Sequence, residues 1–292
     1  MNGHRTALIT DSTCDIPKNL TGQYDIIVVP LHVIWGEETH RDRVEIQPRE
    51  FYQRLTEDPL YPTTAHPTPD GFLNTFEEAA ETGADEIVVI TLSSELSGAF
   101  EAARQASRMI ETPVHVFDSK GTTMSLGWQV LAAARARQRG GRSRSMIEAA
   151  GSVRQRVQLH VCLDTLEYLH KGGRIGGAAK FIGSLLNLKP LVYVDHETGR
   201  VEAGARVRTR KRGLATLYRH FFEALNTENE MHIAVMHGDA PEDAARIADR
   251  IEREFSPAEL LIGMTGPVLG VHTGPRAIAL CGYAKDERRI DL

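Results

Sequence analysis

The chain has 292 residues, of which 41% are hydrophobic and 25% are charged. Its 34 Lys and Arg residues against 39 Asp and Glu residues give a net charge of −5, which argues against nucleic acid or an anionic membrane surface as the partner. The three cysteines match no metal-ligand spacing and leave one unpaired, as expected in a reducing compartment. No signal peptide opens the chain, and no apolar run approaches the roughly 18 residues of a membrane span. We therefore expect a soluble, cytoplasmic protein.

The first half of the chain alternates strand-like and helix-like segments. The expected strands are Ala7–Thr10, Ile26–Ile34, Glu86–Leu92 and Val114–Phe117, and the expected helices are Glu50–Leu55, Gly71–Glu81, Gly98–Ile110, Ser125–Arg137 and Ser143–Arg156. Four strands joined by crossover helices predict a parallel, doubly wound sheet. This pattern ends near residue 155, so we expect an N-terminal α/β domain over residues 1–155.

The second half reads as a different α/β arrangement. The expected strands are Val157–Leu163, Pro190–Val194, Val201–Thr209, His232–His237, Leu260–Met264 and the final segment. The turn Asp195–Arg200 predicts a hairpin, and apolar residues at helical spacing predict an amphipathic helix over Leu214–Leu225. Asp239 and Glu242 have the spacing of a capping box at the start of another helix. We expect a mixed-sheet α/β domain over residues 156–292.

The turn after the third expected strand carries the strongest functional signal. The apolar run ends in Ser93, Ser94 and Ser97, and a helical pattern follows at once. Ligands of open α/β sheets bind beyond the carboxyl ends of the strands, where a helix N-terminus favours an anion. The alternative is that these serines merely cap the helix. The turn therefore predicts either a carboxylate or phosphate seat, or a helix cap.

Other polar segments are expected at the same edge of the sheet. Asp11-Ser12 follows the first strand and Asp118-Ser119-Lys120 follows the fourth, although each could equally cap a loop or helix. The segment Tyr61–Pro69 combines hydroxyls with three prolines, which predicts a nearly rigid loop. Together these segments predict a polar crevice.

Signs of catalytic machinery are weak. The turn Lys171–Gly177 lacks the spacing of a phosphate loop and reads as a flexible basic turn that could meet an anionic partner. His272, between Gly270 and Gly274, could donate to an oxyanion or serve a structural role. The histidines and cysteines show no zinc spacing, and Cys14 has acidic neighbours that would raise its pKa. We therefore expect binding rather than turnover, with no metal.

Taken together, these motifs resemble the DegV family of bacterial fatty-acid-binding proteins. The matching segments run in the family's order through nearly the whole chain: Thr10–Asp15, Val28–Leu31, Thr64 with Pro67–Pro69, Leu92–Gly98, Asp118–Lys120, Leu166–Ile175, Lys189-Pro190, Val207–Lys211, His237–Asp239 and Gly270–Pro275. The resemblance implies two α/β domains that hold a long-chain fatty acid. Its acyl chain would lie in an apolar tunnel, and hydroxyls would hold its carboxylate.

The resemblance also implies roles for individual residues. Thr64 and the Ser93-Ser94 pair would bind the carboxylate, helped by the helix amides after Ser94, and His272 and Arg208 would complete the polar end. We expect Arg208 to act indirectly or transiently, because a desolvated salt bridge would make the carboxylate a poorer nucleophile. The chain would be a lipid-carrying subunit without a cofactor. A separate ATP-dependent kinase, contacted by Arg174, would make the acyl phosphate for phospholipid synthesis.

Three residues depart from the family's pattern. Ala65 and His66 stand where Ser and Gln are usual, and Arg276 stands where Gly is usual, so the hydrogen bonds around the head group are expected to differ. The apolar segment Phe181–Leu186 is a candidate for the tunnel or for ordinary core.

Two other functions stay open. One is an enzyme acting on a small phosphorylated or carboxylated metabolite in the same crevice, with His272 and Asp11 as an acid–base pair. The other is a regulatory or scaffold protein that needs no ligand.

Overall fold

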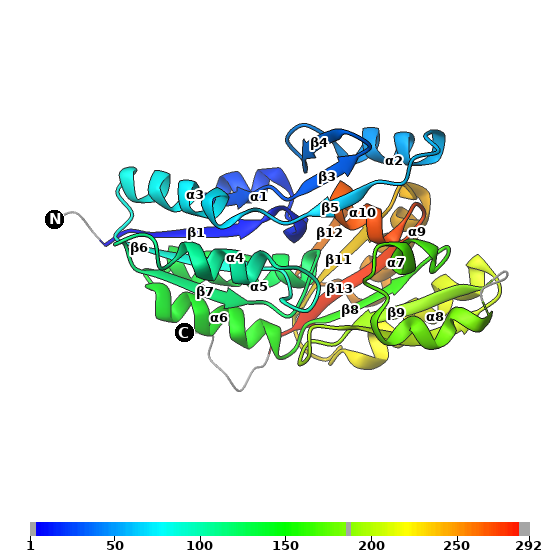
Figure 1. The fold of residues 1–292 in the computed structure, drawn as a ribbon. Helices are drawn as coiled ribbons and strands as arrows, with labels where there is room; N and C mark the ends of the chain where they lie inside the picture. The colour runs from blue at the N-terminus through cyan, green and yellow to red at the C-terminus, as the bar shows by residue number, and fades with distance from the viewer. Residues whose placement is uncertain (1–3, 185–187, 286–292) are drawn as a thin grey trace.

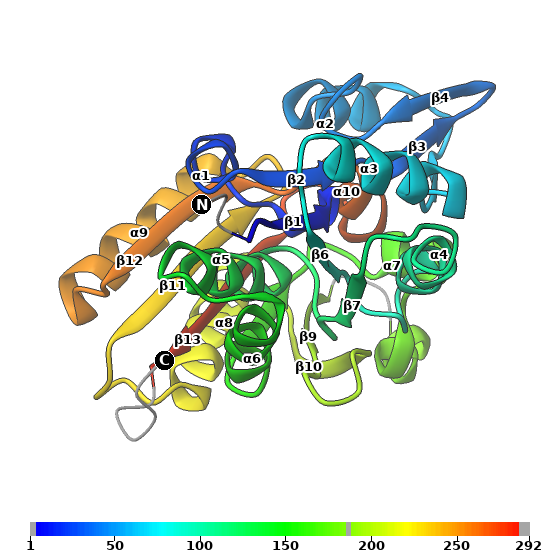
Figure 2. The same cartoon turned by 90° about the vertical axis from the view of Figure 1, so that its left-hand side faces the viewer.

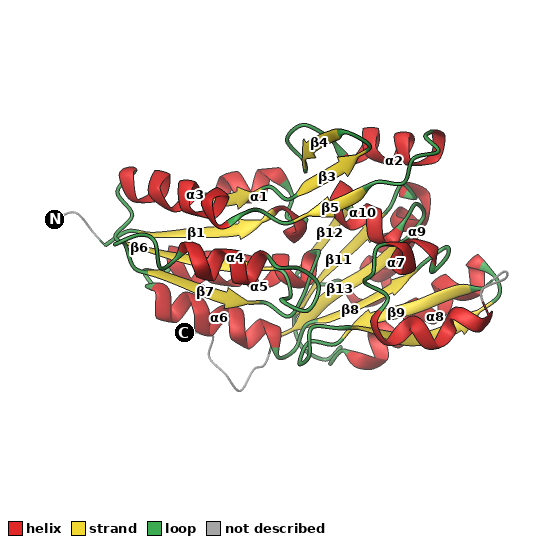
Figure 3. Ribbon diagram, in the orientation of Figure 1, coloured by secondary structure: helices red, strands yellow, loops and turns green. Residues whose placement is uncertain are grey.

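A computed structural model describes residues 4–184 and 188–285 of the chain (Figure 1). Within these residues three sheets are present: the first sheet and the third lie beside each other, and the smallest lies above their junction in this view (Figures 1 and 3). The α/β class that the sequence predicts is confirmed, with a parallel first sheet and a mixed sheet in the second half. No helix within the described residues is long and apolar enough to cross a bilayer.

The first sheet is parallel, with the strand order β2-β1-β6-β7. Its strands are β1 (Thr6–Asp11), β2 (Ile26–Val29), β6 (Glu86–Thr91) and β7 (Val114–Asp118). Helices α3 (Pro69–Glu81) and α4 (Ala99–Ala106) pack together on one face, and α5 (Met124–Gln138) and α6 (Ser143–Arg154) pack together on the other (Figure 2). Helix α1 (Lys18–Gln23) lies against β2, and the short 3-10 helix η1 (Ser12–Cys14) follows β1. Burial on both faces explains the continuous apolar runs of these strands.

The second sheet is small and antiparallel, with the order β4-β3-β5. It contains β3 (His32–Trp35), β4 (Glu38–Arg41) and β5 (Thr63–Ala65), and α2 (Pro48–Glu57) lies between β4 and β5 in the chain. The single strand expected over Ile26–Ile34 is therefore wrong: β2 ends at Val29, and β3 begins in another sheet. Pro30 has no N–H to continue the ladder and marks the break. The expected loop Tyr61–Pro69 likewise contains a strand.

The third sheet is mixed, with the order β10-β9-β8-β13-β11-β12. Its strands are β8 (Gln158–Cys162), β9 (Lys189–Val194), β10 (Val201–Val207), β11 (Met231–His237), β12 (Glu259–Met264) and β13 (Ile278–Ala284). Strands β9 and β10 form the expected antiparallel hairpin. Helices α8 (Arg210–Ala224) and α9 (Pro241–Phe255) cover one face, and α5 of the first half packs against β13.

The two faces of the third sheet belong to two apolar cores. On β13, Ile278 and Leu280 join the core beneath α8 and α9, whereas Ala279 and Cys281 join the core shared with the first half. This alternation follows from the two-residue period of a strand. The inward face is thus free to line a space next to the first sheet.

The remaining helices lie near the junction of the sheets. They are α7 (Glu167–Lys171), the 3-10 helix η2 (Gly176–Ser184) and α10 (Pro267–Thr273). The expected capping box at Asp239 is wrong: α9 begins after Ala240, whose N–H meets His237 Nδ1 (3.2 Å), and Asp239 has a φ of 55°. The domain division near residue 155 falls between α6 and β8 and stays a prediction.

Candidate functional site

A cavity of about 140 Å³ lies at the carboxyl ends of the first sheet's strands. Strand β1 lies between β2 and β6 in the sheet. The connection from β1 to β2 therefore runs to one side, and the chain later enters β6 on the opposite side of β1. Ligands of open α/β sheets bind at such a reversal of strand order. Leu31, Leu92 and Thr123, which follow β2, β6 and β7, all line the cavity. A cavity therefore lies at the predicted edge, but Asp11-Ser12 and Asp118-Ser119-Lys120, which were expected to form a polar crevice there, do not line it.

Much of the cavity wall is apolar and comes from the inward face of the third sheet. The wall residues of this sheet and of the loop after β8 are Leu159, Val161, Leu163, Val192, Val194, Val201, Ala277 and Ala279. They recur at every second position because successive side chains of a strand point to opposite faces. The alternation of apolar residues along these strands could have been used to predict which side chains line the cavity. An apolar wall of this kind favours a hydrocarbon ligand.

A threonine and a histidine meet on the cavity wall. Thr64 Oγ1 of β5 and His272 Nε2 of α10 lie 3.0 Å apart, and both residues line the cavity. Strand β5 is held by β3, where Thr64 pairs with Val33, and α10 packs against both strands. The second sheet thus brings together two residues that the sequence analysis selected from distant segments.

His272 is held in its neutral form. Burial, together with the nearby Arg174 guanidinium, lowers the pKa of His272 to about 4. Its Nδ1 is buried without a hydrogen-bond partner, and Gly172 packs so closely that a Cβ there would lie 2.1 Å from this nitrogen. At pH 7 the ring can therefore donate one hydrogen bond to an anion without carrying a charge of its own.

Further polar groups lie on the wall, and of these the sequence analysis had named only Ser97, as part of the hydroxyl-rich turn. They are Ser97, Thr122, Thr123, Thr265 and Thr273. Thr122 Oγ1 is buried without a partner, so it is available to a ligand. Ser97 and Thr122 follow β6 and β7 by a few residues, so their place after strand ends could have indicated them.

Arg174 also lies on the cavity wall, and of the described lining residues it alone carries a permanent charge. Its Nε donates to Leu96 O (3.1 Å) and its Nη1 donates to Gly172 O (2.8 Å). The side chain is therefore fixed beside His272. The sequence analysis assigned Arg174 to a partner surface, whereas the structure places it next to the proposed head-group site.

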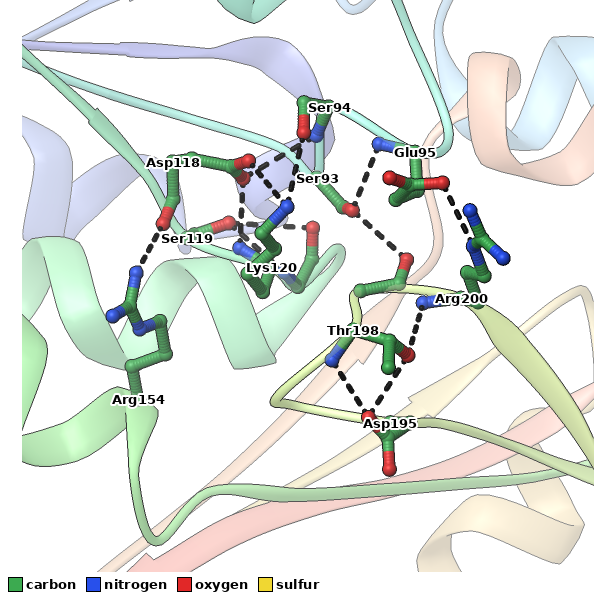
Figure 4. A network of polar contacts seen from close by, with 12 residues as sticks. Ser93, Ser94, Glu95, Asp118, Ser119, Lys120, Arg154, Asp195, Thr198 and Arg200 are labelled. Atoms are coloured by element: carbon green, nitrogen blue, oxygen red, sulfur yellow. Dashed lines mark hydrogen bonds and ion pairs between the residues drawn. The ribbon is translucent and has the colours of Figure 1, made fainter.

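Ser93 and Ser94 do not line the cavity but belong to a network of polar contacts between loops, which Figure 4 shows. The buried Ser93 Oγ donates to Gly199 O (2.8 Å) and accepts from Glu95 N (3.2 Å). Ser94 is exposed, and its Oγ accepts from Lys120 Nζ (3.1 Å), which also pairs with Asp118 (3.0 Å). These hydroxyls hold loops together in the structure. Ser93 does not cap the following helix either, because α4 begins after Gly98 without a side-chain cap.

The structure does not bring Arg208 or Asp11 to the cavity either. Arg208 is exposed between β10 and α8. Asp11 is fully buried, and its carboxylate accepts from Thr13 N (3.0 Å), Thr13 Oγ1 (2.6 Å) and Leu92 N (2.7 Å). Burial raises the pKa of Asp11 to about 6. The carboxylate is engaged in loop structure, so an acid–base pair of Asp11 with His272 has no geometric support.

The departures from the family's pattern have distinct positions. Ala65 and His66 line the cavity, with His66 Nδ1 2.9 Å from Pro67 O. Arg276 lies outside the lining and has a φ of 63°, a conformation that glycine adopts without strain. Phe181 is buried, and the guanidinium carbon of Arg206 lies 5.2 Å from the centre of its ring. Leu185 and Leu186, from the same predicted segment, lie outside the described residues.

Fold and cavity together define an α/β protein with a largely apolar cavity where a parallel and a mixed sheet meet. The chain belongs to the DegV family, whose model, described as an uncharacterised protein of the DegV family, matches residues 5–285. Protein DegV of Bacillus subtilis is 32% identical over 277 residues, which cover 94% of this chain and 98% of that protein.

Solved structures show the same fold. A DegV family protein of Thermus thermophilus, described as binding fatty acid, superposes with a TM-score of 0.90 at 31% identity, covering 96% of this chain and 100% of that one. A stearic-acid-binding protein of Eubacterium ventriosum superposes with a TM-score of 0.87 at 26% identity, covering 98% and 100%. The likeness thus extends over nearly the whole length of each chain.

Proposed function

We propose that this protein binds a long-chain fatty acid, with the carboxylate at Thr64 and His272 and the acyl chain along the third sheet. The observation that carries the proposal is the contact between these two side chains on the wall of a largely apolar cavity. Fatty acids bound by structural relatives support the same ligand class. Ser97, Thr122 and Arg174 lie on the same cavity wall and complete the proposed set of polar groups.

The energetics of the ligand suit this site. Each buried methylene contributes about 0.8 kcal/mol, so an acyl chain of a dozen or more carbons is retained tightly. Removing a carboxylate from water is costly unless donors replace its hydration. Hydroxyls and a neutral imidazole replace that hydration, and Arg174 adds a favourable charge nearby.

A further part of the proposal is that the protein presents the bound carboxylate to a separate ATP-dependent kinase in the cytoplasm. A carboxylate oxygen would attack the γ-phosphorus of ATP, giving the acyl phosphate for phospholipid synthesis and ADP, and this chain would bind and orient the acid. The half-buried Arg174 supports this idea, because it lies on the cavity wall and is still partly exposed to a partner. Ser93, Ser94 and Arg208, which the family resemblance assigns to the head group, do not line the cavity and are not part of this proposed set.

Denaturing extraction of freshly purified protein, followed by mass spectrometry, tests the proposal. We expect close to one fatty acid per chain in the wild type and much less in Thr64→Val. A protein that carries no lipid and takes up none from an oleate solution would contradict it. Turnover of a small carboxylated metabolite without any partner, lost in His272→Ala, would instead support an enzyme.

A further inference from the structure

The polar contacts that join the first half of the chain to the third sheet and α10 include two groups that differ in burial, here called seams. The first seam is buried: Asp15 accepts from Gly266 N (3.0 Å) and from Thr123 Oγ1 (2.6 Å), and Arg43 pairs with Asp15 and donates to Met264 O (2.9 Å). Asp15, Arg43 and Thr123 all have positive φ values, which persist only where the surrounding structure fixes them. Parting this seam would leave a buried charge without its partner, which is strongly unfavourable.

The second seam holds the tip of the β9–β10 hairpin against the turn after β6 (Figure 4). It consists of the hydrogen bond from Ser93 Oγ to Gly199 O (2.8 Å) and the ion pair between Glu95 and Arg200 (2.8 Å). The Arg200 side chain is 63% exposed and that of Glu95 is 35% exposed, so water screens the pair. This seam is therefore the weaker of the two.

The turn at the hairpin tip, residues 195–200, packs closely against Ser93. Asp195 Oδ1 accepts from Thr198 N (2.7 Å) and Glu197 N (3.1 Å), which fixes the turn. Gly199 has a φ of 78°, and a Cβ at this position would lie 2.2 Å from Ser93 Oγ. A glycine here permits both the turn and its close approach to Ser93.

The cavity lies directly behind this seam. Val194 and Val201 at the base of the hairpin line it from one side, and Leu92 and Leu96 of the opposing turn line it from the other. Its volume of about 140 Å³ is close to that of a cavity of roughly 150 Å³ that accommodates benzene. A long acyl chain is larger, so the walls must separate to admit it.

We propose that the hairpin tip (residues 195–200) and the turn (residues 93–97) form a clasp that opens to admit and release the acyl chain, while the Asp15–Arg43 seam stays closed. This inference rests on the proposed function. It gives Ser93 the role of controlling access to the cavity instead of binding the ligand. A contact that opens for entry and for release alike changes both rates together and changes the affinity little.

Stopped-flow fluorescence with cis-parinaric acid, a fluorescent long-chain fatty acid, tests the clasp. In Ser93→Ala and Gly199→Ala we expect binding and release each to accelerate about three- to ten-fold, with Kd within about two-fold of wild type. Because both changes break the same contact, the double variant should exchange about as fast as the faster single variant. Glu197→Gln removes an exposed charge from the same tip and should match wild type.

Hydrogen exchange provides a readout that needs no ligand. Amides of residues 195–200 and 96–97 should exchange faster in Ser93→Ala, and those near Asp15 and Gly266 should not change. The clasp proposal would be overturned if both single variants bind and release the fatty acid at wild-type rates. It would also be overturned if the amides of residues 195–200 exchange at the same rate in Ser93→Ala as in the wild type. A wild-type protein that binds no cis-parinaric acid would overturn the proposed function, and the opening of the tip would then be judged by hydrogen exchange alone.

Discussion

Thr64 and His272 are 208 residues apart in the chain, and their 3.0 Å contact defines the proposed head-group site. The hydroxyl is a partner for the buried ring, and the ring is kept neutral by burial and by Arg174. A bound carboxylate would accept from the hydroxyl and from the imidazole. The contact therefore links local structure directly to ligand affinity.

Thr64→Val tests this link while keeping the size and branching of the side chain. The change removes the hydroxyl that would donate to the bound carboxylate, and a hydrogen bond to a charged group contributes about 1.5–3 kcal/mol. We expect the affinity for cis-parinaric acid, measured by fluorescence titration, to fall about ten-fold. The neighbouring Thr63→Val is the matched control, because Thr63 is exposed and does not line the cavity. Equal affinities in the two variants would refute the assignment.

The titration of His272 gives a second prediction. In ligand-free protein its ring should protonate with a pKa of about 4, because burial penalises the charged form. A carboxylate bound beside the ring favours the charged form, so loading with oleate should raise this pKa. NMR of the ring protons measures both values. A pKa that is the same with and without oleate would place the carboxylate elsewhere.

Sequence reasoning selected some residues of the site and missed others for identifiable reasons. Thr64 and His272 were selected, although their contact depends on a small sheet that the sequence did not reveal. Ser93 was selected over Ser97 because the family resemblance assigned the carboxylate to the Ser93-Ser94 pair, and the local sequence of this hydroxyl-rich turn does not separate the two positions. Which of the two faces the cavity depends on the docking of the hairpin tip at Gly199, a contact between distant segments that no local pattern encodes.

At the scale of elements, strand β8 shows how one strand serves both the core and the site. Leu159 and Val161 face the cavity, whereas His160 packs against Tyr193 and Phe221 on the other face, with ring centres 5.9 and 6.2 Å apart. The apolar wall is therefore a property of the strand's two-residue period. Substitutions on its cavity face should alter the ligand site before they alter the fold.

Val161→Phe places a larger side chain into the empty space. We expect the lipid retained after purification to fall several-fold, with the melting temperature unchanged or higher, because the added atoms fill a cavity instead of crowding packed core. Val161→Leu should give a smaller decrease. Quantified lipid extracts and thermal melts of the three proteins test this. Full lipid content in Val161→Phe would show that the acyl chain lies elsewhere.

The elements were largely predictable, with errors where short strands are involved. The four strands of the first sheet and the hairpin follow from apolar runs and turn signals. The break at Pro30 and the three-residue strand β5 were missed, because a brief extended segment differs little in sequence from a loop. That small sheet carries Thr64, so the error concerned the element that positions the site.

At the scale of the whole molecule, buried ionisable groups make stability depend on pH. Burial lowers the pKa of His160 to about 4 from an unfolded value of about 6.5. The unfolded chain thus binds more protons between pH 6.5 and 4, and the stability that the neutral ring provides is lost as the pH falls through this window. Burial raises the pKa of Asp42 from its ordinary value of 3.8 to about 7, so the folded state binds the extra proton there and the effect on stability is opposite across this whole range.

The variant His160→Phe removes the titrating group but keeps an aromatic ring beside Tyr193 and Phe221, so it isolates the contribution of His160 to the pH dependence of stability. Between pH 7 and pH 4.5 the wild type should lose roughly 1–2 kcal/mol more of its free energy of unfolding than the variant. Urea denaturation at several pH values measures the difference. Parallel curves for the two proteins would show that His160 does not carry this dependence.

The fold class and the edge of the sheet that bears the site could be predicted, because both follow from strand order and from the direction of parallel strands. The cavity itself could not, since it depends on how the third sheet packs against the first. Contacts such as Arg43 with Asp15 and Ser93 with Gly199 set that packing, and each joins residues far apart in the chain.

A crystal structure of the protein loaded with oleate tests the central claim most directly. The account predicts one acyl chain along Leu159, Val161 and Val192, with its carboxylate within hydrogen-bond distance of Thr64 Oγ1 and the His272 ring. A carboxylate at Ser94 or Arg208, or an acyl chain outside this cavity, would contradict it.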